Sequence, residues 1–200
     1  MADIHYSFCP VCRSGDLKHV FNTKDYTVSG REFEIVHCNA CSLRFTQNVP
    51  DVDAIGDFYK SEDYISHSNT SKGLINKLYQ QVRVRTMKQK AAIVKKFTGV
   101  AAGKLLDIGC GTGTFLHTML QEGWDVAGLE PDADARAVAK QQYGINARPS
   151  HELMSLNTGS FNAITLWHVL EHVHTLHGYV DQMKRLLADN GMLFIAVPNY

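Results

Sequence analysis

A glycine-rich turn between a buried strand and a helix constrains the fold of this chain more than any other feature. Residues 104–113 read Lys-Leu-Leu-Asp-Ile-Gly-Cys-Gly-Thr-Gly, an apolar strand that runs into closely spaced glycines. Residues 114–122 continue with apolar side chains at helical spacing. Glycines let backbone N–H groups approach a ligand closely, and the helix N-terminus adds a partial positive charge. The pattern predicts a ligand-binding loop.

A carboxylate at the end of the next predicted strand indicates what kind of ligand this is. Residues 124–130 read as a strand that ends at Glu130, 21 residues after Gly109. A carboxylate there accepts hydrogen bonds from both ribose hydroxyls of a nucleoside. The dinucleotide-binding fingerprint has a glycine at the position of Thr114 and an uncharged residue at the position of Asp107 in the strand before the glycines. The sequence therefore favours a nucleoside cofactor other than a dinucleotide.

The remaining sequence continues to alternate between helix and strand patterns. The expected elements are a helix at 132–143, a third strand at 145–147, a fourth at 161–167, a helix at 174–188 and a fifth strand at 192–197. Asp132 is expected to cap the first of these helices, and Gly144 to end it. This alternation predicts an α/β fold with a doubly wound parallel sheet and a ligand at the carboxyl ends of its strands.

The spacing Asp107-x-Gly109-x-Gly111-x-Gly113, followed by Glu130, resembles the first motifs of class I S-adenosylmethionine-dependent methyltransferases. The resemblance implies a Rossmann-like sheet of order 3-2-1-4-5. It also implies that Asp107 and the three glycines surround the aminocarboxypropyl part of S-adenosyl-L-methionine and that Glu130 binds its ribose. Adenine contacts are expected after the third strand, near Ser150 and His151. Because the family usually adds two further strands and this chain ends at Tyr200, we expect a truncated domain that lacks them.

A cluster of histidines and a glutamate follows the predicted fourth strand. Residues 167–174 read Trp-His-Val-Leu-Glu-His-Val-His, and on a helix positions 168, 171 and 172 share one face. The placement and letters resemble the ubiquinone-biosynthesis-type branch of the methyltransferases, where an acidic residue linked to a divalent metal often occupies the position of His168. We predict His168 as general base, oriented by Glu171 or His172, with a loop-fixing role as the alternative.

Two further readings of this segment stay open. Trp167 is expected to wall the cofactor or the acceptor, with simple packing as the alternative. His-x-x-Glu-His is also the inverted zinc-protease motif, although a metalloprotease gives no reason for the glycine turn or for Glu130.

Four of the five cysteines form two pairs, Cys9-Pro-Val-Cys12 and Cys38-Asn-Ala-Cys41. Such pairs are poor disulfide candidates in a reducing compartment, whereas four thiolates at this spacing close a tetrahedron around zinc. Strand-like residues between them, at 20–21, 26–28 and 32–36 with Ser29-Gly30 as a turn, predict a hairpin. We predict a zinc ribbon with structural Zn²⁺, because four protein ligands leave no open position for water; His5 or His37 in place of one sulfur stays open.

The charges are segregated although the formal net charge is zero. Residues 64–106 carry nine basic and no acidic side chains, and residues 74–98 have a helical pattern free of proline and glycine. This pattern predicts a helix with a solvated basic face, or alternatively a surface for RNA. We expect a zinc-ribbon-like module at 1–48, a helical linker at 49–99 and a cofactor-binding domain at 100–200.

These patterns together predict a cytoplasmic methyltransferase with a small-molecule acceptor. The sequence has no apolar run long enough for a membrane span, and because its first residues lack the pattern of a signal peptide we expect none. An RNA methyltransferase that uses the ribbon and the basic helix is the alternative, and a non-catalytic cofactor-binding interaction protein is the third reading.

Overall fold

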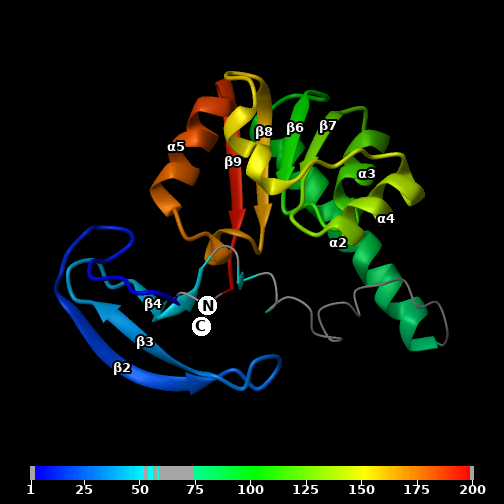
Figure 1. The fold of residues 1–200 in the computed structure, drawn as a ribbon. Helices are drawn as coiled ribbons and strands as arrows, with labels where there is room; N and C mark the ends of the chain where they lie inside the picture. Colours follow the sequence, from blue (N-terminus) through cyan, green and yellow to red (C-terminus); the bar gives the residue numbers. More distant parts are fainter. Residues whose placement is uncertain (1–2, 52–53, 56–57, 59–73, 199–200) are drawn as a thin grey trace. The chain divides into compact units, whose positions relative to one another are not determined.

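The computed structural model describes residues 3–51, 54–55, 58 and 74–198, with the backbone alone for residues 74–80 (Figure 1). The chain divides into two compact units, residues 1–72 with 174–177 and residues 73–173 with 178–200. Of the predicted helical linker, residues 59–73 lie outside the described residues. Within the described part of the chain, no helix has the length and apolar character needed to cross a membrane.

The first unit is built on an antiparallel sheet. Its strands are β2 (Leu17–Lys24), β3 (Glu32–Cys38) and β4 (Arg44–Gln47), in the order β2-β3-β4. A separate pair joins β1 (Asp3–Ile4) to β5 (Val49–Pro50). The hairpin of β2 and β3 connects the two cysteine pairs, as predicted.

The expectation of a strand at 26–28 is wrong, because these residues form the turn of the hairpin. The Asp25 carboxylate accepts hydrogen bonds from the backbone N–H of Thr27, Val28 and Ser29 at 2.9, 3.1 and 2.8 Å. The Ser29 hydroxyl donates a further bond, at 2.7 Å. Bonds from the Ser29 hydroxyl and amide, with those from Thr27 and Val28, hold the pKa of Asp25 far below its usual range. An aspartate that collects local amides stabilises a turn over an extended strand.

The second unit confirms the predicted α/β class. Its parallel strands are β6 (Lys104–Ile108), β7 (Asp125–Leu129), β8 (Phe161–Trp167) and β9 (Leu187–Ala196), in the order β7-β6-β8-β9. The helices are α2 (Leu74–Thr98), α3 (Thr114–Gln121), α4 (Ala133–Tyr143) and α5 (Leu176–Leu186), with short 3-10 turns η2 (Ser150–Ser155) and η3 (Leu170–His172). This order places β6 at the centre of the crossovers, so its carboxyl end is a natural ligand position.

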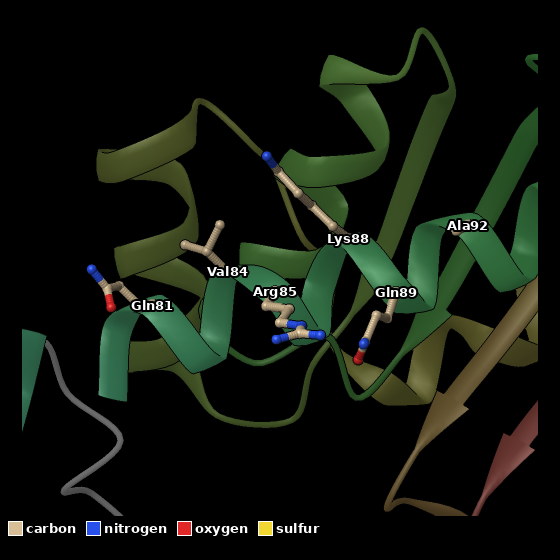
Figure 2. A pocket seen from close by; sticks show the side chains of 6 residues that line it. All are labelled: Gln81, Val84, Arg85, Lys88, Gln89 and Ala92. Carbon is tan, nitrogen blue, oxygen red and sulfur yellow. The ribbon is translucent and has the colours of Figure 1, made fainter. Parts of the chain in front are cut away.

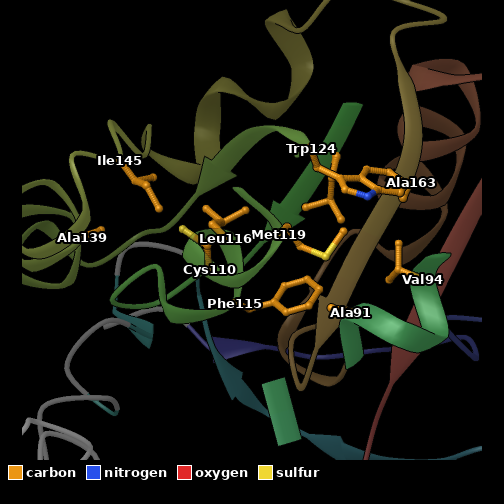
Figure 3. Packing of buried hydrophobic residues seen from close by; sticks show 11 residues of the cluster. Ala91, Val94, Cys110, Phe115, Leu116, Met119, Trp124, Ala139, Ile145 and Ala163 are labelled. Atoms are coloured by element: carbon orange, nitrogen blue, oxygen red, sulfur yellow. The ribbon is translucent and has the colours of Figure 1, made fainter. Parts of the chain in front are cut away.

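Alternation along the strands supplies a core on each face of the sheet. Leu105 and Ala163 pack in the cluster that includes Ala91 and Val94 of α2 and Phe115 of α3 (Figure 3). Their strand neighbours Leu106 and Ile164 point to the opposite face, in the cluster that contains Met183 and Leu186 of α5. Successive strand residues point to opposite faces, so near-continuous apolar strands indicate a sheet covered on both sides.

The structure corrects two predicted elements. The predicted third strand is reduced to a single parallel bridge between Leu129 and Arg148. The sheet therefore has the order 2-1-4-5 instead of the predicted 3-2-1-4-5. The last helix ends at Leu186 rather than near residue 188, because β9 already begins at Leu187 and passes through a register shift before Met192. Carbonyls of the last helical turn accept the amides of Gly159 and Ser160 instead of continuing the helix.

The predicted boundaries of α4 are confirmed. The Asp132 carboxylate accepts the backbone N–H of Asp134 and Ala135, at 2.7 and 3.1 Å, and Gly144 ends the helix at φ 68°. This cap fixes where the chain turns after β7, directly beside Glu130.

We predict opposite effects for two glycine-to-alanine changes. A Cβ at Gly128 of β7 would lie 2.6 Å from Cδ1 of Leu116 and 2.7 Å from Sγ of Cys110, so Gly128→Ala should destabilise the fold by about 1–3 kcal/mol. Gly178 lies on the exposed side of α5 with nothing within 4 Å, so Gly178→Ala should stabilise it by about 0.5–1 kcal/mol. Thermal unfolding measures both, and equal effects would contradict this packing.

Candidate functional site

Three glycines shape the loop between β6 and α3, each for a different reason. Gly109, Gly111 and Gly113 have φ of 73°, 54° and 77°, which side chains rarely adopt. A Cβ at Gly109 would collide with Cγ2 of Val169, and one at Gly113 would lie 3.0 Å from Cβ of Ala139. A Cβ at Gly111 would meet nothing within 4 Å. The middle of the loop is therefore open to an approaching ligand.

The Glu130 carboxylate binds this loop to the end of β7. Oε2 accepts the backbone N–H of Gly111 at 2.8 Å, and Oε1 accepts that of Asp132 at 3.0 Å. The carbonyl of Leu129 accepts the amides of Gly109 and Cys110, at 2.7 and 3.0 Å. Burial raises the pKa of Glu130, and the two amides oppose this rise. Each carboxylate oxygen retains a second acceptor site, so both can still bind hydroxyl groups.

Asp107 is the second-to-last residue of β6 and is almost completely buried, at 2% exposure. Its Oδ1 accepts the hydroxyl of Thr165, on the neighbouring strand β8, at 2.6 Å. Burial raises the pKa of Asp107 to about 7, while the Thr165 hydrogen bond and the charge of Lys90 lower it and the charge of Glu130 raises it. The buried carboxyl therefore changes charge near neutral pH.

Helix α2 contributes two cations to the site, although the sequence predicts them as part of a basic surface. The Arg83 guanidinium donates hydrogen bonds to the hydroxyls of Thr114, at 2.6 Å, and Thr112, at 3.3 Å, where the loop enters α3. The Lys90 ammonium lies 4.4 Å from the centroid of the Trp167 ring. Their separation by seven residues, two helical turns, was the signal that both point to the same side.

The histidine and glutamate cluster after β8 converges as predicted, although not on an α-helix. His168 has φ 61° and its amide donates to the Ala196 carbonyl at 2.8 Å, and residues 170–172 form the 3-10 turn η3. Oε1 of Glu171 lies 3.7 Å from Nδ1 of His168 and 4.0 Å from Nε2 of His172. Burial lowers the pKa of His172, and the charge of Glu171 opposes this. The α-helix that the inverted zinc-protease motif requires is absent from this segment.

The other two predicted cofactor contacts occupy different surroundings. Ser150 begins η2, two residues after Arg148, which forms the bridge to Leu129 of β7. Trp167 ends β8 and packs edge-on against Phe115, with ring centroids 5.7 Å apart. Ser150 therefore lies near the end of the strand that carries Glu130, while Trp167 forms part of the wall between α2, α3 and the sheet.

The four paired cysteines gather their sulfurs within 4.8 Å of one another. Cys9 and Cys41 are 3.5 Å apart at Sγ, as are Cys12 and Cys38, close to the ~3.8 Å that zinc–sulfur bonds of about 2.3 Å give in a tetrahedron. The amides of Cys12 and Val11 bond to the Cys9 sulfur and, against the effect of burial, lower its pKa to about 7. Within the described part of the chain this is the one group of three or more such residues that could hold a metal ion, and neither His5 nor His37 belongs to it.

A hollow of about 580 Å³ runs along α2, lined by Gln81, Val84, Arg85, Lys88, Gln89 and Ala92 (Figure 2). All of these residues belong to one helix, and no residue of the glycine loop reaches it. Lys95 of the same helix is bound to the Glu122 carboxylate. Part of the basic charge on α2 is therefore used within the unit rather than offered to a partner.

Comparison with known proteins identifies the family to which the second unit is similar. The family described as methyltransferase domain matches residues 79–200. Ubiquinone biosynthesis O-methyltransferase of Glaesserella parasuis is 34% identical over 120 residues, which cover 54% of this chain and 51% of that protein. The enzyme of the same name from Haemophilus ducreyi is 29% identical over 118 residues, covering 54% and 50%. The chain thus spans about half the length of the curated relatives it matches.

Two solved structures share the fold of this unit. A protein of Methanococcus maripaludis, provisionally assigned as an S-adenosyl-L-methionine-dependent methyltransferase, superposes with a TM-score of 0.50 at 15% identity, over 54% of this chain and 53% of that one. A protein of Pyrococcus horikoshii superposes with a TM-score of 0.51 at 18% identity, over 60% and 55%. At these identities the likeness concerns the fold alone.

The buried Asp107 predicts how stability depends on pH. Its folded-state pKa of about 7 exceeds the ~4 of an unfolded aspartate, so the native state takes up a proton as the pH falls through 7 and gains stability. Asp107→Asn cannot take up this proton. Between pH 7.5 and 5.5 the wild type should therefore gain roughly 2 kcal/mol relative to Asp107→Asn in denaturant unfolding. Asp189→Asn, at an exposed aspartate, serves as control, and a constant difference across this range would contradict the assignment.

Proposed function

The chain belongs to the methyltransferase domain family, and from this premise we propose that it transfers a methyl group from S-adenosyl-L-methionine to a small-molecule acceptor. The observation that carries the proposal is the open backbone at Gly111, held by the carboxylate of Glu130. Loop amides and an acid one strand over are the groups that a nucleoside with a ribose diol requires. The names of the curated relatives support a small acceptor in place of RNA.

Each part of the site has a proposed role toward the cofactor. Glu130 binds the ribose hydroxyls with its remaining acceptor sites, and Asp107 and the loop glycines face the aminocarboxypropyl group. Arg83, at the junction of loop and α3, offers a guanidinium to the carboxylate of that group. Ser150 and Trp167 border the adenine and the sulfonium ends.

We propose His168 as the general base that removes the proton of the acceptor. Its imidazole is exposed at the carboxyl end of β8, and imidazole is the side chain most often used for this role. Glu171, whose Oε1 lies 3.7 Å from Nδ1, orients the ring. The methyl group, when the cofactor is bound, comes from its sulfonium, and the protein holds the attacking atom in line with it.

The four cysteines are proposed as ligands of a structural zinc ion. Their sulfurs already stand at nearly tetrahedral separations, and backbone amides stabilise the thiolate of Cys9. A module of this size buries little apolar surface, so the metal would supply its stability. We accordingly propose a zinc-ribbon-like module at 1–48, a helical linker at 49–99 and a cofactor-binding domain at 100–200. A reducing cytoplasm suits the thiolates.

Labelled methyl transfer tests the proposed activity. The protein is incubated with methyl-labelled S-adenosylmethionine and an extract separated into RNA, protein and metabolites. We expect label in the metabolite fraction, and His168→Gln should reduce it by about 10²- to 10⁴-fold, the usual contribution of a general base. His19→Gln, in the first unit, should not change it. Nuclease-sensitive label would overturn the small-molecule acceptor, and full turnover by His168→Gln would overturn the base.

Metal analysis tests the zinc module. Purified protein should contain one equivalent of zinc, and Cys9→Ser should lose it together with the folded structure of the first unit. Cys110→Ala, which removes the buried cysteine of the glycine loop, is the matched control and should retain the metal. Zinc well below one equivalent, together with normal folding of Cys9→Ser, would refute the assignment.

A further inference from the structure

Lys90 is a half-buried cation that the proposed methyl transfer does not use. Its ammonium lies over the Trp167 ring, 4.4 Å from the centroid. Burial lowers the pKa of Lys90, and the charge of Asp107 opposes this. No carboxylate of the described residues lies within 4.0 Å of its ammonium. The indole, and a carboxylate acting from a greater distance, therefore hold this charge.

The surroundings of the Lys90 ammonium are those of a site for an organic cation. Asp107 and Thr165 are register partners on β6 and β8, and Trp167 follows Thr165 by two residues, so all three side chains face the same side of the sheet. The Phe115 ring packs nearly perpendicular to the indole and holds it in place. The indole Nε1 is buried without a hydrogen-bond partner. An aromatic face beside a buried carboxylate attracts a cation strongly because little water screens either group.

The cofactor of the proposed function carries such a cation, and the inference rests on that function. In the proposed function the sulfonium lies near the base that serves the acceptor. That base, His168, directly follows Trp167 in the sequence. Two positive charges in one weakly screened place repel each other. We propose that Lys90 is a resident cation of the cofactor site, which covers Trp167 beside Asp107 while the site is empty and gives up this place to the sulfonium.

The lysine side chain suits such an exchange. Its flexible four-carbon stem carries a compact charge, and its neighbours on α2, Gln89 and Ala92, are exposed to solvent. The ammonium can therefore reach water without movement of the helix. While it stays nearby, it weakens binding of S-adenosylmethionine more than binding of S-adenosylhomocysteine, whose sulfur is neutral.

Calorimetry with these two ligands tests the proposal. Lys90→Met should raise the affinity for S-adenosylmethionine relative to S-adenosylhomocysteine by about three- to tenfold, because only one ligand has the sulfonium charge. Lys90→Gln should act in the same way, and Lys90→Arg should retain the wild-type ratio. Lys96→Met is the matched control: it removes the same charge from the same helix, where the ammonium lies 5.5 Å from the Phe97 centroid on an exposed face.

Tryptophan fluorescence gives a second readout that does not depend on the ratio. Binding of S-adenosylmethionine should change the emission of Trp167 more in Lys90→Met, where the sulfonium covers a ring that no cation covered before, than in the wild type, where one cation replaces another. The proposal is overturned if folded Lys90→Met keeps the wild-type ratio, or if Lys96→Met shifts it equally. Absence of binding of either ligand to the wild type would instead overturn the proposed function itself.

Discussion

The contact between the Glu130 carboxylate and the Gly111 amide is the interaction on which the site depends. It joins a loop after β6 to the end of β7, which are neighbours in the sheet but lie 19 residues apart in sequence. The same carboxylate takes up the amide of Asp132, whose own side chain caps α4. One buried acid therefore sets the loop, the strand end and the following helix together. A ligand that binds there meets groups already in place.

Helix α2 is part of this site rather than a separate basic surface. Ala91 and Val94 pack it onto the sheet, Arg83 reaches the hydroxyls at the start of α3, and Lys90 lies over Trp167. The family match beginning at residue 79 agrees with this, because it includes most of the helix. The helix thus brings positive charge to a site whose acids, Asp107 and Glu130, are buried.

Sequence patterns with a local physical cause predicted their structures well. The loop glycines, the strand ends, the cap at Asp132 and the cysteine pairs each follow from short-range geometry. The errors arose where a competing contact decides the outcome. The Asp25 carboxylate accepts three backbone amides and so stabilises a turn in a segment with a strand-like sequence. The last residues of a predicted helix belong to strand β9 instead. Arg83 and Lys90 point toward the loop and the sheet because of the way α2 packs. A count of charges along the sequence carries no information about this packing.

The binding of S-adenosylhomocysteine to wild type and to Glu130→Ala, measured by titration calorimetry on protein shown to be folded, tests the central claim most directly. If Glu130 joins the loop to a nucleoside, the wild type binds one equivalent and Glu130→Ala loses at least tenfold in affinity. Glu152→Ala, at a partly exposed acid paired with Arg148, leaves the affinity unchanged. A wild type that releases no heat, or a Glu130→Ala variant that binds as tightly, would contradict the account.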